Sequence, residues 1–563
     1  MYTSPTLLKF YSNKLFLASI FLLIIKNASA QLNFGKPTVT GNVETIFQYL
    51  QSDSTIDAFA PEQKAVMNSY ANINYSLGNF KAGVRLESYM PSVAGYPAFY
   101  SGSGIGYRFL EYSNDKVTAV AGNFFEQFGS GLILRSYEER AIGLDNAMEG
   151  AKINFKPISG VNIKGVFGKM RSNFNQGRVE LSEGIIRGLD GDFSLNQIFK
   201  GFKESKLKMT FGGSFVSRYQ GGSNDTIILP KNVAAYGGRF DIKYNNFYLN
   251  GEYIHKINDP SANNNYIYNK GHGAIVNMGY SQKGLAVLFS AKSIDNMFFR
   301  ADRTVTGNQL MIGFLPALTK NHTYNLAASL YPYASAPSGE VAYQLDVLYK
   351  IPRKSFLGGK YGVDINMNIA TVFKPIRHST GSDFRGNRLL YEGRPYDKSD
   401  SLYHFDFNVE IKKKISKKFK LTASYFHFIF NNDVNEVTKD ASGYVQSDIV
   451  VLDGAYKINR KHSIRAEVQA LFTEQDKGNW ATFLMEYTVS PHWFAAVIYQ
   501  SNYGNPDKKK RQNYPFASFG YTLDASRFIV SYGKQRAGIF CIGGVCREVP
   551  ATNGLTFSFT TTF

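Results

Sequence analysis

Most of this chain alternates between apolar and polar side chains, which is the pattern of extended strands with one apolar and one polar face. The last ten residues show it clearly, because Leu555, Phe557, Phe559 and Phe563 share one parity while hydroxyl side chains occupy the other. About 26 such segments follow one another, many of about ten residues, which is the length that a tilted transmembrane strand needs. A soluble sandwich would alternate in the same way, with its apolar face in a core. The number and length of the segments favour the membrane alternative.

The lengths of the connections give a second test. Going backward from Phe563, long and short connections alternate, with tight turns at 524–526, 490–492, 282–283 and 245–246. The long connections are expected at residues 51–64, 91–103, 127–146, 172–183, 220–231, 258–270, 374–402 and 432–443. Short periplasmic turns and long extracellular loops are typical of outer-membrane barrels. The sequence therefore predicts an all-β fold, a large single-chain transmembrane antiparallel β-barrel of about 22–26 strands over residues 31–563. Its first strand, near residues 38–50, leaves no room for an N-terminal plug domain.

The N-terminus has the layout of a cleaved secretory signal over residues 1–30. Lys9 and Lys14 precede an apolar run over residues 15–25, and Ala28 and Ala30 frame a small-residue cleavage site. A transmembrane anchor would need a longer apolar run. We expect export, with Gln31 as the first mature residue and the bacterial outer membrane as the destination.

The charge and hydropathy of the chain limit which classes of partner we expect for it. The formal charge is +19, and about +16 without the three lysines of the leader. An exported chain seldom meets nucleic acid, so we expect lipid headgroups, surface glycans and other proteins as partners. Lysine runs at residues 412–414 and 417–418 flank an expected periplasmic turn, where anionic lipid lies within reach. A mean hydropathy of −0.23 and the lack of a long apolar run after the leader exclude a helical membrane protein.

The two cysteines, Cys541 and Cys546, lie in one short segment. In an oxidising compartment this spacing predicts a small disulfide loop. A zinc site would need more ligands than this pair supplies. We expect no metal and no cofactor.

Residues 122–140, GNFFEQFGSGLILRSYEER, followed by GLDN at 143–146, resemble an uncharacterised family of outer-membrane barrels from the Bacteroidota. The resemblance implies a location and a fold, and no reaction. The C-terminal strand, with Phe557, Phe559 and Phe563, also resembles the signal that the barrel assembly machinery reads during insertion. That machinery is therefore an expected partner.

One motif occurs twice, at 102–111 and 129–138: Gly-Ser-Gly, an aliphatic residue, two residues, Arg, two residues, Glu. It has two interpretations. One is a repeated hairpin with a local ion pair. The other is a loop over residues 127–146 that folds into the barrel and narrows the lumen with Arg135, Glu138, Glu139 and Arg140. On the polar face of the strand near residues 463–473, Arg465 and Glu467 are further candidates for the lumen.

Catalytic signatures are missing from the sequence. It contains neither a Gly-x-Ser-x-Gly elbow nor a His-Glu-x-x-His pair, and its eight histidines are scattered. A catalytic triad assembled from separate loops would leave no such signature, so the sequence does not exclude one. We nevertheless expect that the protein is not an enzyme.

A barrel of this size has a bore wider than that of a porin, so something must fill it. Our first hypothesis is a non-enzymatic scaffold or conduit of an envelope complex for assembly, secretion or uptake. Its partners would be other outer-membrane proteins or surface lipoproteins, and the basic and aromatic segment 374–402 would offer a binding surface. The alternative is a self-constricted, porin-like channel for small solutes. An outer-membrane hydrolase ranks third.

Overall fold

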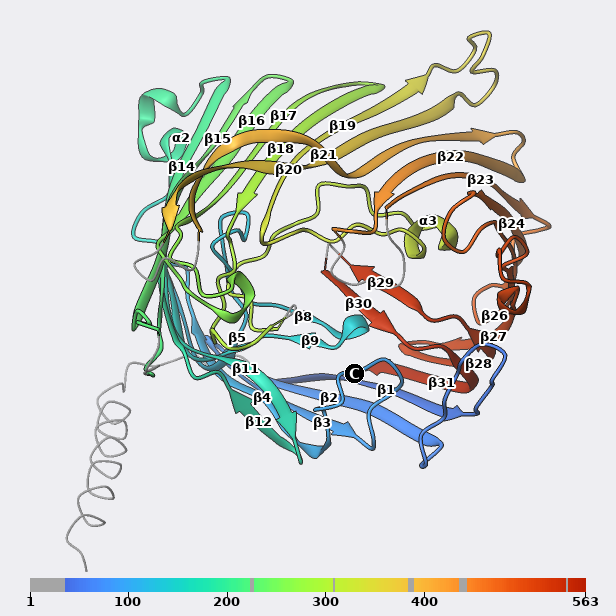
Figure 1. The fold of residues 1–563 in the computed structure, drawn as a ribbon, viewed down its shortest axis with the longest axis horizontal. Coiled ribbons are helices and arrows are strands. Elements are labelled where there is room, and N and C mark those ends of the chain that lie inside the picture. Colours follow the sequence, from blue (N-terminus) through green and yellow to red (C-terminus); the bar gives the residue numbers. More distant parts are fainter. Residues whose placement is uncertain (1–35, 223–226, 307–308, 383–388, 435–442, 543–544) are drawn as a thin grey trace, which may run out of the picture.

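The structure is a computed structural model that describes residues 36–222, 227–306, 309–382, 389–434, 443–542 and 545–563. Side chains are not described for residues 382, 389 and 539–548. Within these ranges the chain forms one closed antiparallel β-barrel of 24 strands (Figure 1). The barrel class and the strand range predicted from the sequence are confirmed.

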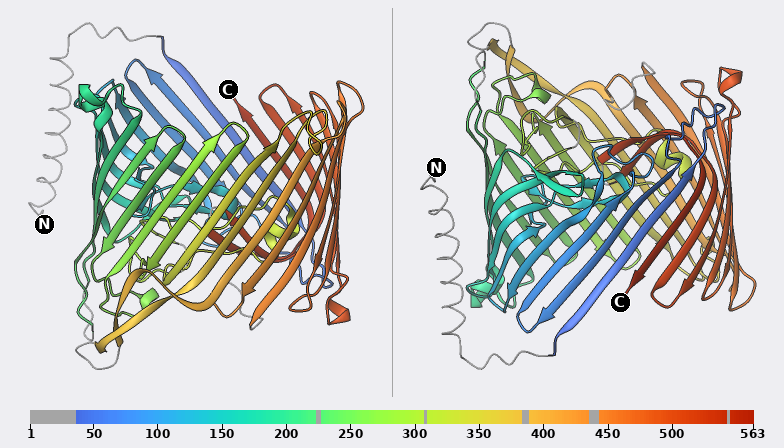
Figure 2. Two further views of the ribbon diagram at one scale, coloured as in Figure 1. Left: turned by 90° about the horizontal axis from the view of Figure 1, so that it is seen from above. Right: turned by 90° about the horizontal axis from the view of Figure 1, so that it is seen from below.

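The strands of the barrel wall, in chain order, are β1 (Thr38–Leu50), β2 (Ala65–Leu77), β3 (Phe80–Tyr89), β4 (Gly102–Ser113), β5 (Val117–Phe124), β10 (Met148–Phe155), β11 (Val161–Asn175), β13 (Ile185–Ser194), β14 (Leu207–Tyr219), β15 (Asn232–Tyr244), β16 (Phe247–Lys256), β17 (Gly271–Gln282), β18 (Leu285–Asp295), β19 (Gly339–Ile351), β20 (Val363–Ser382), β21 (Leu389–Lys414), β22 (Phe419–Asn431), β23 (Tyr444–Lys457), β24 (His462–Phe472), β25 (Trp480–Val489), β26 (Trp493–Ser501), β27 (Asn513–Leu523), β28 (Ser526–Gln535) and β31 (Thr552–Thr562). Each pairs with its neighbours along the chain, and Figure 2 shows their common tilt.

The first and last strands close the barrel. β1 pairs with β31 in a register that sets Phe47 opposite Phe557 and Tyr49 opposite Leu555. Two backbone hydrogen bonds join Gly41 to the final residue, Phe563, in both directions, at 2.8 and 2.9 Å. Pairing the last strand with the first removes the free edges that an open sheet would expose.

The two faces of the wall differ as the alternation predicts. On β24, Val468 and Phe472 point outward and are about half exposed, while Glu467 and Gln469 point inward and are buried. An outer face of large apolar side chains fits lipid.

The two rims of the barrel also differ. One rim, called here the turn rim, holds the start of β1, the end of β31 and the shorter connections, such as those at 245–246 and 524–525. The opposite rim, called the loop rim, holds the longer ones. On the loop rim, β12 (Arg178–Leu181) pairs with the end of β11. Short helices lie at the turn rim, α2 (Leu195–Ile198) and η2 (Lys200–Phe202), and at the loop rim, η3 (Ala262–Asn264) and η4 (Lys508–Lys510).

Two expectations about the loops need correction. Residues 374–402 are mostly strand, because β20 continues to Ser382 and β21 begins at Leu389. This long hairpin bends over the loop rim, where Arg377 donates to Asp295 at 2.9 Å and the Tyr396 backbone donates to Ser293 at 3.0 Å. The longest connection of the described chain is instead residues 296–338, which the loop assignment missed because its apolar stretches do not look like a solvated loop.

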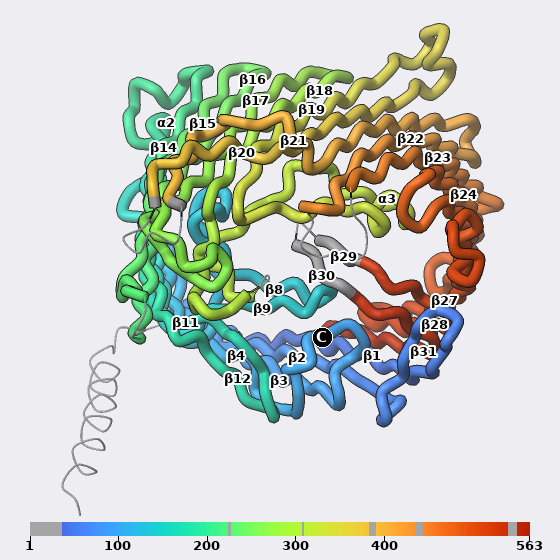
Figure 3. Tube along the Cα trace, in the orientation of Figure 1, coloured from blue at the N-terminus to red at the C-terminus, as the bar shows by residue number. Residues whose placement is uncertain are grey.

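Three connections of the loop rim enter the barrel within the described ranges (Figures 1 and 3). The first inner segment is 125–147, with β6 (Gln127–Phe128), β7 (Leu134–Arg135), β8 (Glu138–Glu139), η1 (Arg140–Ile142) and β9 (Leu144–Asp145). The second is 296–338, with α3 (Asn325–Ser329). The third is 536–551, with β29 (Gly538–Ile542) and β30 (Val545–Val549). The hydrophobic core of the molecule lies between these segments and the inner wall.

Candidate functional site

The first inner segment packs its apolar side chains against the inner wall. Phe128, Ile133 and Leu134 are completely buried. They belong to one cluster with inward-facing wall residues from β5 to β18, which include Val120, Met148, Val166, Ile186, Val216, Ile254 and Ile294. Gly188 on β13 leaves room for the ring of Phe128, since a Cβ there would come within 2.8 Å of it. The wall is thus apolar on both faces where this segment lies against it.

Charged groups fix the tip of the same segment. Arg85 on β3 binds Glu138 at 2.9 Å and Asp145 at 2.6 Å, both on the first inner segment. It also pairs with its neighbour Glu87 at 2.6 Å. From β11, Arg171 binds Glu87 at 2.7 Å and Asp145 at 2.9 Å. We call these residues, together with Arg140 and Glu44, the arginine–carboxylate network.

Arg140 extends the network to the first strand. It bonds Glu44 of β1 at 2.7 Å and Glu138 at 2.9 Å, and its guanidinium lies 4.4 Å from the ring centre of Tyr70. Burial disfavours the charged form of Arg140, but the hydrogen bond and charge of Glu138 outweigh it and raise the pKa of the guanidinium. The segment is therefore tied to three separate wall strands, β1, β3 and β11.

The burial of these charged side chains determines whether the network contributes stability or fixes a position. The side chains of Glu87 and Arg171 are 0% and 1% exposed. Burying an ion pair contributes little net stability, because desolvation offsets the attraction, but removing one partner leaves an uncompensated buried charge. The network therefore acts as a positional lock that selects one placement of the segment.

A smaller ion pair fixes the start of the segment. Glu126 accepts from Lys164 at 2.9 Å and lies 3.4 Å from Lys152, both on the wall. Burial pulls the pKa of Glu126 upward, but the hydrogen bond from Lys164 and the charges of both lysines outweigh it and lower the pKa.

The second inner segment binds the first through the backbone. The Arg135 amide donates to Ile312 at 2.8 Å, and the Phe314 amide donates to Gly131 at 2.9 Å. The guanidinium of Arg135 lies 4.1 Å from the ring centre of Phe314. The two segments therefore form one body.

That body reaches the far side of the lumen through α3. The Leu326 amide donates to Gln469 of β24 at 3.0 Å, and Gln500 of β26 donates to Asn325 at 2.8 Å. Around them an apolar cluster joins the second segment to the inner face of β22 to β25, with Tyr324, Leu326, Ala327 and Tyr331 against Phe426, Phe428, Phe430, Val445, Ile449, Val451, Leu471 and Trp480. Burial raises the pKa of Tyr324 to about 12, so its hydroxyl stays neutral.

The third inner segment completes the crossing. β29 contacts both α3 and η1, and Arg536 donates to Ser329 at 2.5 Å. The three segments thus meet in the middle of the barrel (Figure 1). The backbone register of β29 and β30 sets Cys541 opposite Cys546; their side chains lie outside the described ones, so the disulfide stays a prediction.

Comparison with known proteins places the chain in a family. A family model described as "Family of unknown function (DUF6029)" matches residues 12–563. The chain belongs to this family. None of the proteins with curated descriptions matches the DUF6029 chain in sequence.

Several solved barrels are similar to it in fold. The siderophore receptor PirA from Pseudomonas aeruginosa is 11% identical, with a TM-score of 0.40 over 94% of this chain and 81% of that one. The copper transporter OprC is 10% identical, with a TM-score of 0.40 over 94% and 80%. OccK8 (OprE) from Pseudomonas aeruginosa is 8% identical, with a TM-score of 0.33 over 94% and 98%. The similarity is confined to barrel architecture.

The candidate residues named from the sequence of this DUF6029 protein fall into separate places. Glu138 and Arg140 lie together in the arginine–carboxylate network, whereas Arg135 stacks between Tyr137 and Phe314 and Glu139 accepts from the Ala141 amide at 3.3 Å. Arg465 and Glu467 bind each other on β24, at the opposite wall. Arg465 also pairs with Asp453 at 3.1 Å and Glu486 at 2.8 Å. Phe557 and Phe559 lie in β31, and Phe563 follows its last residue.

Sequence reasoning missed the wall residues of the network, Glu44, Arg85, Glu87 and Arg171, as well as Asp145. The sequence could not single these residues out, because charged side chains are expected at any inward-facing position of a water-filled barrel. A stronger signal was available for the second segment. The inward positions of β22 carry Phe426, Phe428 and Phe430, and apolar side chains on both faces of a barrel strand indicate that something dry packs inside.

Two kinds of structure are absent from the described residues. They contain no group of three or more His, Cys, Asp or Glu side chains placed to hold a metal ion. No helix among them combines the length and apolarity needed to cross a membrane.

Proposed function

We propose that this DUF6029 protein is a bacterial outer-membrane channel whose lumen is constricted by its own chain and which passes small solutes. The turn rim faces the periplasm and the loop rim faces outward, as in barrels with short periplasmic turns. The leader at residues 1–30 directs export, and the host belongs to the Bacteroidota, as the resemblance of residues 122–146 implies.

One observation carries the proposal. The three inner segments are bonded to each other and reach opposite walls, from Arg85 and Arg171 on one side to Gln469 and Gln500 on the other. A scaffold that depends on partners to fill its bore would not need such a structure. A channel needs one, because an open bore of this width would leak.

Conductance through a planar lipid bilayer tests the proposal. Residues 125–147, the whole first inner segment, can be replaced by a two-residue Asn-Gly turn, because Phe124 and Met148 are already direct neighbours in the sheet. The shortened barrel should conduct several-fold more than the wild type. A matched control shortens the turn at 352–362, which lies at the turn rim away from the inner segments, and should leave the conductance unchanged. A folded shortened barrel that conducts no better than the wild type would refute the channel.

A second candidate function, the scaffold of an envelope complex, has one observation in its favour. Phe356 is 99% exposed and Leu357 62% exposed in that same turn, beside Arg353 and Lys354. An apolar pair among cations suits a docking contact on the periplasmic side. Isolation in mild detergent with mass spectrometry of what stays bound tests it; loss of a stoichiometric partner in Phe356→Ser would support the scaffold.

A further inference from the structure

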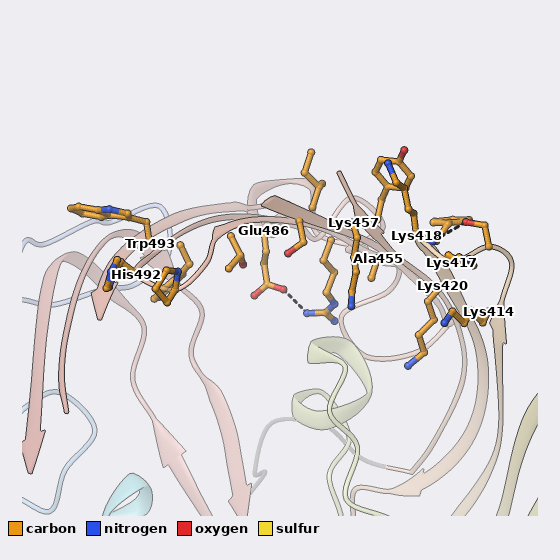
Figure 4. A pocket seen from close by; sticks show the side chains of 18 of the residues that line it. Lys414, Lys417, Lys418, Lys420, Ala455, Lys457, Glu486, His492 and Trp493 are labelled. Atoms are coloured by element: carbon orange, nitrogen blue, oxygen red, sulfur yellow. Dashed lines mark hydrogen bonds and ion pairs between the residues drawn. The ribbon is translucent and has the colours of Figure 1, made fainter. Parts of the chain in front are cut away.

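The inner wall holds a pocket that the constriction does not use. It lies at the turn rim, has a volume of about 740 Å³, and faces the lumen on the side of α3 (Figure 4). The residues that line it come from β21 to β28 and the turns between them, and they include Lys420, Lys457, Arg465, Glu486, Phe494 and Arg527.

The charge of this lining is one-sided. Among all the described residues that line the pocket, seven are lysine or arginine and one, Glu486, is acidic. The strand register places most of the charges on the inner face. Lys457 has the same parity as Asp453, and Lys420 has the same parity as the buried Ser424, whereas Tyr456 points outward and is 45% exposed.

Several of these cations are free to bind a ligand. Arg465 is already engaged by Asp453, Glu467 and Glu486. In the described structure, Lys420, Lys457 and Arg527 have no carboxylate within ion-pair distance. Arg527 rests on the ring of Phe494, 5.1 Å from its centre, which keeps the guanidinium at the edge of the pocket.

We propose that this pocket binds a small soluble polyanion that carries several phosphate or carboxylate groups, and that it does so on the solute's path through the barrel. The proposal rests on the proposed channel function and adds the substrate class. The volume suits a small-molecule ligand, since such sites measure about 300–1,000 Å³. Lys420 and Lys457, on the neighbouring strands β22 and β23, bind its charges, while Phe494 adds apolar surface to the pocket.

A cavity on the opposite wall of the lumen differs from this pocket in its charge. A smaller cavity of about 190 Å³ lies there beneath Ser130, and it is lined by Asp192, Asp241 and Glu252 with a single cation, Arg239. The excess of positive charge in the larger pocket therefore favours an anion there over the smaller cavity.

A phospholipid headgroup has the same chemistry as a soluble anion, so the source must be tested. The pocket faces the lumen while Trp493 and Tyr456 face outward, which favours a soluble ligand. Lys417 and Lys418 lie on the turn itself, within reach of headgroups.

Calorimetric titration of pyrophosphate into the full-length protein in phosphatidylcholine nanodiscs tests the proposal. The double variant Lys420→Gln/Lys457→Gln should weaken binding by about tenfold or more, because two unit charges leave the contact. The matched control is Lys208→Gln/Lys243→Gln, whose lysines face each other on the opposite wall at the same rim; it should bind as the wild type does. Raising the salt concentration from about 0.1 to 1 M should weaken wild-type binding, because it shortens the Debye length to about 3 Å.

Equal binding by the wild type and the Lys420→Gln/Lys457→Gln variant would overturn the proposal, as would equal losses in the variant and the control. Nanodiscs with about one third phosphatidylglycerol separate the two sources of the anion. Abolished pyrophosphate binding in them would assign the site to headgroups and overturn the soluble ligand; unchanged binding would support it.

The channel function is read separately, from the reversal potential in a salt gradient. An anion-selective wild type and a less selective double variant would support both proposals. If the barrel conducts and the double variant changes neither selectivity nor binding, the channel proposal stands and the anion-binding pocket is refuted. Pyrophosphate binding in a barrel that does not conduct, even when shortened, would keep the site and refute the channel.

Discussion

Arg171 on β11 and Glu87 on β3 form a two-bond ion pair inside the barrel, with Nη2–Oε2 at 2.7 Å and Nη1–Oε1 at 2.8 Å. Their strands are separated in the sheet by β4, β5 and β10. At the level of Arg171, however, β5 and β10 have ended and β11 contacts β4 directly, so the pair spans β4 alone, and Asp145 of the first inner segment joins it there. The lock that holds the segment is thus built mainly from the wall.

Glu87→Gln should loosen this lock. Arg85 and Arg171 would lose the carboxylate between them and stay buried, and breaking such a pair costs about 3–5 kcal/mol. We expect a fall of that size in the free energy of unfolding, measured by urea titration in lipid bilayers. Asp364→Asn is the control, because it breaks the Lys350–Asp364 pair, whose side chains are 54% and 53% exposed. It should change the free energy by less than about 1 kcal/mol; equal effects of the two variants would show that the network locks nothing.

Lowering the pH should weaken the attachment of the start of the first inner segment to the barrel wall. The pKa of Glu126 is held below its ordinary value of 4.5, so its ion pairs stabilise the folded position above that pH. The stabilisation should disappear as the pH falls below 4.5 and the carboxylate takes up a proton. Hydrogen–deuterium exchange of residues 125–136, corrected for the intrinsic effect of pH, should therefore rise on acidification. In Glu126→Gln the exchange should be raised at neutral pH and change little with acid; a wild-type response in this variant would contradict the assignment.

The wall of the barrel could be predicted from the sequence because its determinants are local. The alternation of Leu555, Phe557 and Phe559 with hydroxyl residues sets one face of β31 outward wherever the strand lies. Turn lengths then fix the order of neighbours, since each tight turn joins adjacent antiparallel strands.

The contents of the lumen could be predicted only in part. The Gly-Ser-Gly motif at 129–131 drew attention to the first inner segment, but its contacts with Arg85 and Arg171 depend on residues far apart in the chain. The second inner segment was not predicted, because its residues do not alternate between apolar and polar side chains. Its apolar residues, such as Ile312 and Leu326, are buried against the inside of the wall, where the usual rule predicts polar neighbours.

Cys541 and Cys546 should form a disulfide in protein isolated from its native envelope. Directly opposed residues of an antiparallel pair have Cα atoms about 4.5–5.5 Å apart, within the range that a disulfide spans. Alkylation followed by mass spectrometry should label neither cysteine unless a reductant is added first. Cys541→Ser should leave Cys546 open to the reagent. Labelling of both cysteines in the unreduced wild type would show free thiols.

Gly188→Val should push the first inner segment away from the wall. A Cβ at this position would come within 2.8 Å of the Phe128 ring, which is completely buried and cannot move aside inside a packed cluster. Because the backbone of β13 stays extended there, the barrel itself should still form. Single-channel recordings should show a higher or more fluctuating conductance than the wild type. Gly201→Val is the matched control, since nothing lies within 4 Å of a Cβ at Gly201, in the connection between β13 and β14. A folded Gly188→Val barrel with wild-type conductance would mean that the packing of Phe128 does not control the opening of the lumen.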